Sequence, residues 1–99
     1  MKTVFSSVFE TDFAGVVGYY AADVSPEISR RFENCVVETF EKILATPEIG
    51  RRRQDLSHPE IRSVTVAGFD SFVIFYQVRK NELFFVRLLH GARNLPALL

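Results

Sequence analysis

A chain of 99 residues is long enough for one modest hydrophobic core, so residues 1–99 are expected to form one domain. The formal net charge is zero, which argues against a general nucleic-acid binder, because such proteins gain affinity by neutralising phosphates. The charge is unevenly spread. Residues 1–50 hold four Lys or Arg and eight Asp or Glu, and residues 51–99 hold the reverse. The second half is therefore compatible with an anionic partner.

A single cysteine, Cys35, excludes an internal disulfide, and its place among apolar helix positions favours a small buried hydrophobe. The apolar residues near the N-terminus are interrupted by serines and acids, which is unlike a signal peptide. No apolar run reaches the length of a membrane span. We therefore expect a cytoplasmic protein without a membrane partner.

The first elements are a short strand and a helix. Thr3–Val8 has strand composition and is expected at a sheet edge. From Phe9 to Tyr20 the apolar residues recur with helical spacing, and two acids lie in the first turn. Gly15 and Gly18 are three residues apart, which predicts a close approach to a second helix.

The second helix has clear boundaries. Ser25 is suited to the N-cap, Pro26 to the first helical position, and Pro47 disfavours helical geometry in the residue before it. The helix should therefore end near Thr46. Two amphipathic helices joined by a few residues predict an αα-hairpin.

The rest of the chain is predicted to be β. Three apolar or alternating segments, at 61–67, 72–78 and 83–89, are separated by short polar links at 68–71 and 79–82. This order predicts an α+β domain, β-α-α-β-β-β, with an N-terminal helical hairpin packed on a small antiparallel sheet. Residues 51–59 form the longest irregular segment, and Arg51–Arg53 within it is interpreted as a solvated charge run.

The most apolar run, Leu83–Leu89, contains one charge, Arg87, and is expected to be a central strand. A charged residue there needs a partner. One interpretation pairs Arg87 with a helix carboxylate such as Glu38 or Glu41, and the other makes it part of a binding patch. Arg62 is predicted to share its sheet face, with His90 on the opposite face unless a bulge intervenes.

The four candidate site residues of this half are Arg62, Arg87, His90 and Arg93. For His90 a structural role at the strand end is favoured. Leu95 and Leu98 lie in an apolar tail that must pack on the domain or meet a partner. No Cys/His spacing suits a metal and no Gly-rich loop suits a nucleotide, so no cofactor is expected.

The segments VSPEISRRF, TFEKILATPEIGRRR, FVIFYQV and VRLLHGARNLPALL, in this order, resemble the ParE branch of the RelE/ParE toxins. Members of this family are the toxins of type II toxin–antitoxin pairs and are often called plasmid stabilisation proteins. The resemblance implies a toxin neutralised by an antitoxin, which lays an extended or helical segment over a hydrophobic groove of the toxin. It also implies one of two targets, DNA gyrase or mRNA on the ribosome.

RNA cleavage through the 2′-hydroxyl needs a general base, a general acid and cations. RelE-like toxins supply Lys and Arg on the sheet and often a C-terminal Tyr or His. Here Val73 stands where relatives carry Arg, the tail has no Tyr and Lys is scarce, although Arg93 is suitably placed.

These departures favour gyrase inhibition by binding. The alternatives are a ribosome-dependent mRNA endonuclease that uses the four candidate residues, or a non-toxic corepressor partner of the antitoxin. The predicted antitoxin- or target-binding set is Arg62, Arg87, His90, Arg93, Leu95 and Leu98.

Overall fold

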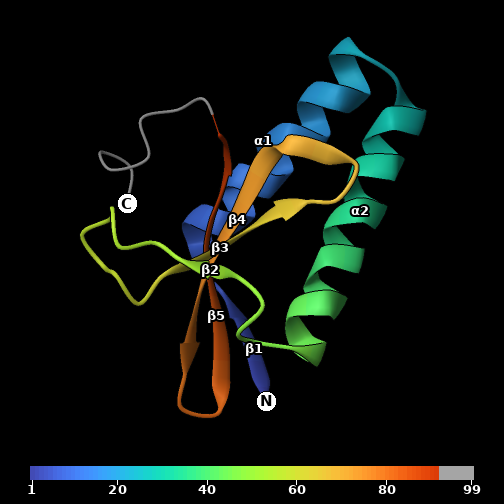
Figure 1. Cartoon of the computed structure of the whole chain (residues 1–99). Coiled ribbons are helices and arrows are strands. Elements are labelled where there is room, and N and C mark those ends of the chain that lie inside the picture. The colour runs from blue at the N-terminus through green and yellow to red at the C-terminus, as the bar shows by residue number, and fades with distance from the viewer. Residues whose placement is uncertain (92–99) are drawn as a thin grey trace.

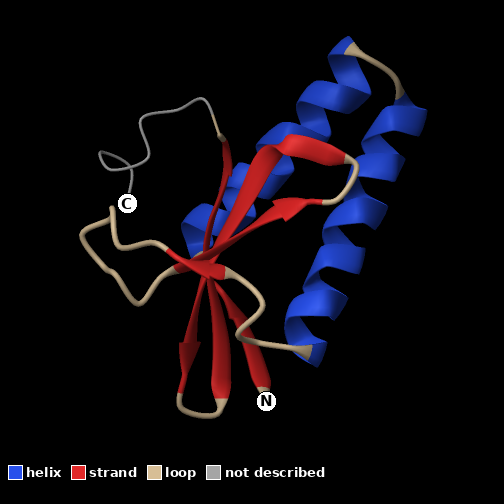
Figure 2. Cartoon of the chain, viewed as in Figure 1, coloured by secondary structure: helices blue, strands red, loops and turns tan. Residues whose placement is uncertain are grey.

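The computed structural model describes residues 1–91 as two helices on one side of a five-stranded sheet (Figures 1 and 2). The elements are β1 (Lys2–Phe5), α1 (Ser7–Asp23), α2 (Pro26–Ala45), β2 (Arg51–Arg52), β3 (Arg62–Val66), β4 (Phe69–Arg79) and β5 (Glu82–His90). The predicted α+β class and element order are confirmed, with β2 as an additional two-residue strand. None of the described helices is long and apolar enough to cross a bilayer.

The first strand is shorter than predicted. Strand composition continues to Val8, but Ser6 already acts as the N-cap of α1, and its hydroxyl accepts a hydrogen bond from the Phe9 amide at 2.9 Å. The capping geometry therefore ends β1 at Phe5 and starts the helix two residues before Phe9.

Helix α1 is apolar around most of its circumference, and Phe9 is its one fully buried side chain. The expected close approach of a second helix at Gly15 and Gly18 is wrong, because a Cβ at either position would meet nothing within 4 Å. Tyr19 is 57% exposed beside them. One face of α1 therefore carries small and aromatic residues that nothing in residues 1–91 covers.

Helix α2 begins and ends as its sequence predicts. The Ser25 hydroxyl accepts from the Ile28 amide at 3.1 Å, Pro26 opens the helix, and Thr46 is the C-cap just before Pro47. The two helices are joined through Ser29, whose hydroxyl donates to the Val17 carbonyl at 3.0 Å. The αα-hairpin is thus confirmed.

The sheet order is β1-β5-β4-β3-β2. The predicted antiparallel meander forms β3, β4 and β5, while β1 pairs in parallel with β5 at the edge, so the complete sheet is mixed. The predicted turn at 68–71 is displaced. Gly68, at φ +90°, closes a tight turn with Ala67, and β4 starts at Phe69.

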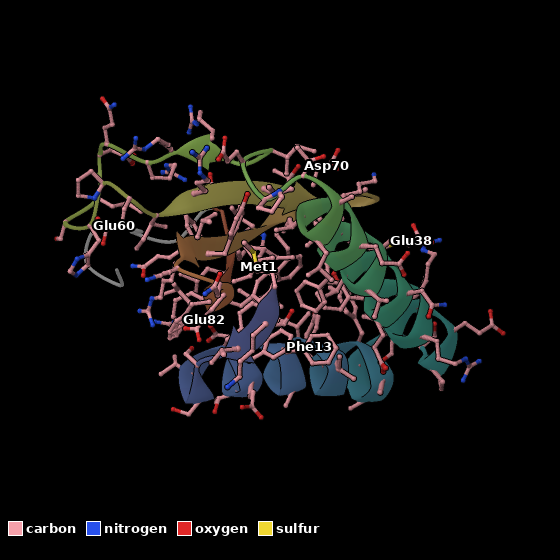
Figure 3. The ribbon with its side chains drawn as sticks, turned by 90° about the horizontal axis from the view of Figure 1, so that it is seen from below. Met1, Phe13, Glu38, Glu60, Asp70 and Glu82 are labelled. Atoms are coloured by element: carbon pink, nitrogen blue, oxygen red, sulfur yellow. The ribbon has the colours of Figure 1, made fainter. Side chains whose placement is uncertain are left out.

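The main core lies between the sheet and the helices. Phe13 points from α1 into this space, and Glu38 points away from α2 (Figure 3). A smaller cluster on the other face of the sheet contains Leu56, Ile61, Phe75 and Leu89. The loop after β2 contributes Leu56 and Ile61 to it, so this part of the irregular segment is packed.

Candidate functional site

The outer edge of β5 is completed by α1 where β1 ends. Phe5 is the last β1 residue paired with β5. The Ser6 amide then donates to the Phe85 carbonyl at 3.0 Å, and its hydroxyl donates to the Val86 carbonyl at 2.7 Å. Further along, the Leu88 amide donates to the Asp12 carboxylate at 3.1 Å. The N-cap Ser6 and the Asp12 side chain of α1 thus satisfy backbone groups that a longer β1 would otherwise pair.

Arg87 forms a two-pronged ion pair with Asp12. Its Nε lies 2.8 Å from Oδ2 and its Nη2 lies 3.0 Å from Oδ1. The two side chains are only 18% and 12% exposed. The hydrogen bonds that Arg87 donates to the Asp12 carboxylate raise the pKa of Arg87 above its ordinary value.

The prediction that a helix carboxylate pairs with Arg87 is therefore confirmed, but the predicted residues, Glu38 or Glu41, are wrong. Glu38 and Glu41 are exposed on α2, and Asp12 of α1 is the partner. The ion pair gives Arg87 a structural role, while its place in a binding patch stays a prediction.

Arg62 and Arg87 do not share a sheet face. Arg62 pairs with Tyr76, which pairs with Phe85, whereas Arg87 pairs with Phe75 on the opposite face. The cause is a register shift between Phe75 and Tyr76, which places an extra residue in β5. His90 pairs with Phe72 and lies on the opposite face from Arg87, as predicted.

Arg62 and Tyr76 hold the loop between α2 and β2. The Arg62 guanidinium donates to the carbonyls of Glu48 and Gly50 at 3.1 and 2.9 Å. The Tyr76 hydroxyl donates to the Pro47 carbonyl at 2.7 Å and accepts from the Gly50 amide at 2.9 Å. Burial raises the pKa of Tyr76, so the hydroxyl stays protonated and can donate.

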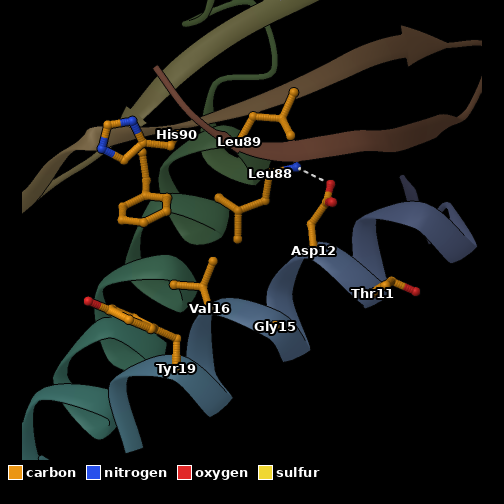
Figure 4. Close-up of a pocket in the computed structure, with 9 residues that line it drawn as sticks. Thr11, Asp12, Gly15, Val16, Tyr19, Leu88, Leu89 and His90 are labelled. Carbon is orange, nitrogen blue, oxygen red and sulfur yellow. Dashed lines mark hydrogen bonds between the residues drawn. The ribbon is translucent and has the colours of Figure 1, made fainter. Parts of the chain in front are cut away.

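His90 borders a pocket of about 640 Å³ between β5 and α1 (Figure 4). Its ring makes an edge contact with Phe72, with centroids 5.3 Å apart. Figure 4 shows Val16 and Tyr19 on the helix side of this pocket and Leu88, Leu89 and His90 on the strand side. The remaining lining residues are Thr11, Asp12, Gly15 and Phe72.

Arg93, Leu95 and Leu98 lie outside the described residues, so their predicted roles are not tested. Within residues 1–91, no group of three or more His, Cys, Asp or Glu side chains is placed to hold a metal. Sequence reasoning missed Asp12, which was assigned only to the first turn of a helix. It also missed Tyr76, a fully buried residue in the apolar middle of β4.

Residues 4–95 match the family described as the ParE toxin of the type II toxin–antitoxin system, parDE. The chain belongs to the ParE toxin family. A chain of the chromosomal ParDE toxin–antitoxin system from P. aeruginosa has the same fold, with a TM-score of 0.75 and 18% identity over 91% of this chain and 95% of that chain.

A second solved structure, a conserved hypothetical protein from Helicobacter pylori, aligns at a TM-score of 0.48 and 15% identity, over 94% of this chain and 97% of that chain. No curated protein matches. Membership of the ParE toxin family agrees with the resemblance carried by the sequence segments.

Proposed function

We propose that this chain is the toxin of a type II toxin–antitoxin module, that it inhibits DNA gyrase by binding, and that a cognate antitoxin neutralises it. The structural roles of the candidate arginines support binding over RNA cleavage. A ribonuclease must gather its acid, base and cations around one phosphate. Arg62 instead donates to loop carbonyls and Arg87 to Asp12, and they lie on opposite faces of the sheet.

Induction of the chain alone in a bacterial host tests the target. We expect induction of the SOS response and accumulation of gyrase–DNA cleavage complexes, because a toxin that binds gyrase interferes with strand resealing. Codon-positioned mRNA cuts without an SOS response would instead establish the endonuclease alternative. A folded Arg87→Ala variant that retains full toxicity would remove Arg87 from the predicted binding set.

The face of α1 that nothing in residues 1–91 covers supports an antitoxin partner. The pocket bordered by His90 lies along this helix, and a second, apolar pocket of about 420 Å³ lies near its N-terminal half. The second pocket is lined by Phe5, Phe9, Glu10, Phe13 and Phe40. Apolar grooves of this kind accept an amphipathic segment of a partner protein.

A Gly15→Gln substitution tests this surface. Gly15 is exposed on α1 and lines the pocket, so a Gln side chain there meets no clash in the isolated chain. The same side chain would fill space that a partner bound in the pocket needs. Overpacking costs about 1–3 kcal/mol, so affinity for the antitoxin encoded beside the toxin should fall about tenfold in calorimetric titration. Asn34→Gln, exposed on α2, is the matched control. Equal affinity of both variants would place the antitoxin elsewhere.

A further inference from the structure

The strand β2 forms the outer edge of the sheet beside β3, and both of its residues are exposed. The Arg53 amide donates to the Ile61 carbonyl at 2.8 Å, continuing the β2–β3 ladder. In an antiparallel ladder the bonded residues alternate, so the Arg52 amide and carbonyl point outward, away from β3. Among the described residues neither group has a hydrogen-bond partner, so they form an open donor and acceptor at the sheet edge.

The two arginines of β2 flank this edge from opposite faces. Arg51 pairs with Ser63 on the face away from the helices, and Arg52 pairs with Arg62 on the helix side. Within residues 1–91, neither guanidinium forms a hydrogen bond or ion pair. Arg53 differs from them in having an ion-pair partner, because its Nη2 lies 2.7 Å from Oδ2 of Asp55. The sequence-based interpretation of Arg51–Arg53 as a solvated run is therefore wrong for Arg53 and agrees with the exposure of Arg51 and Arg52.

The electrostatic potential at this edge is positive. The Arg53 hydrogen bond, with a smaller contribution from Arg51, lowers the pKa of the exposed Asp55 carboxyl to about 2. Asp55 thus remains ionised near neutral pH and neutralises Arg53. The positive charges of Arg51 and Arg52 can therefore attract an acidic group of another molecule.

A groove of about 450 Å³ adjoins Arg51. It combines two guanidiniums, two hydroxyls and three aliphatic side chains, from Ile49, Arg51, Arg53, Ser63, Val64, Thr65 and Val73. It offers no aromatic ring for base stacking, which single-stranded nucleic acids use for binding. Aliphatic walls beside cations fit an extended peptide that carries both apolar and acidic residues.

We propose that the outer edge of β2 binds an extended acidic segment of a partner protein. The segment adds a strand by pairing with the outward amide and carbonyl of Arg52. Its carboxylates meet Arg51 on one face and Arg52 on the other, and its apolar side chains lie against the groove next to Ile49. This docking does not depend on which protein the toxin inhibits.

The test is a titration of the full chain with a fluorescein-labelled octapeptide that repeats Val-Val-Glu-Glu and is capped at both ends, because this order places both residue types on each face of an added strand. We expect saturable binding that weakens as salt is raised, because exposed ion pairs are screened. The double variant Arg51→Glu/Arg52→Glu should weaken binding about tenfold or more, since each reversal replaces an attraction with a repulsion. Arg30→Glu, an exposed position on α2, is the matched charge control.

A second pair of variants separates backbone pairing from charge. Arg52→Ala removes the guanidinium alone, whereas Arg52→Pro also removes the outward amide. If a strand is added, the proline variant should bind more weakly than the alanine variant while both keep the circular dichroism spectrum of the folded chain. The proposal is overturned if the Arg51→Glu/Arg52→Glu variant keeps full affinity, or if labelled octauridylate binds more tightly than the peptide.

Discussion

Replacing Asp12 with Ala should lower the free energy of unfolding by about 2–4 kcal/mol, which is a large fraction of the stability of a small domain. Asp12 accepts three hydrogen bonds, two from the Arg87 guanidinium and one from the Leu88 amide. The substitution would remove the Asp12 carboxylate from a mostly buried guanidinium and would take this acceptor from the Leu88 amide at the sheet edge. Urea denaturation followed by circular dichroism measures the change.

A double-mutant cycle tests the cause of this loss. Asp12→Ala combined with Arg87→Met should be more stable than the sum of the single changes predicts, because the second substitution removes the buried charge that Asp12 neutralises. Glu38→Ala is the control, since Glu38 was the partner expected from sequence and is exposed on α2. It should change stability by less than about 0.5 kcal/mol. Additive effects at Asp12 and Arg87 would show that the ion pair contributes little.

Local signals in the sequence were sufficient for most of the fold. The caps of α2 depend on Ser25, Pro26 and Pro47, whose preferences act over one turn of chain. The predicted start of α1 is late because strand composition continues through Val8, while the Ser6 hydroxyl decides the boundary. The β3–β4 turn is likewise shorter than composition predicts, because the positive φ of Gly68 allows a tight turn that composition alone does not reveal.

The candidate site depends on register, which one sequence does not specify. A regular β5 would place Arg87 opposite Ile74, on the same face as Arg62, as predicted. The extra residue near Val86 moves Arg87 opposite Phe75. The ion pair joins residues 75 positions apart, so no local pattern identifies Asp12 as the partner. The pairing of Arg51 and Arg52 with β3 likewise becomes visible only in the folded sheet.

Gly50→Ala should destabilise the domain by about 2–4 kcal/mol, although the change adds one methyl group to a loop. A Cβ at Gly50 would lie 2.6 Å from the Tyr76 hydroxyl and 2.8 Å from its ring. The tyrosine has little room to move, because it is fully buried and packs against Phe85. Overpacking costs about 1–3 kcal/mol, and displacing the hydroxyl also weakens its bonds to the Gly50 amide and the Pro47 carbonyl.

Gly15→Ala provides the matched control with the opposite sign. Its new Cβ meets nothing within 4 Å and lies within a helix, so the free energy of unfolding should rise by up to about 1 kcal/mol. If Tyr76 causes the clash at Gly50, combining Gly50→Ala with Tyr76→Phe should cost less than the two single changes together. Urea denaturation of the four variants measures both effects. A Gly50→Ala variant within 0.5 kcal/mol of the unmodified chain would mean that the loop shifts freely, and that Tyr76 does not hold it.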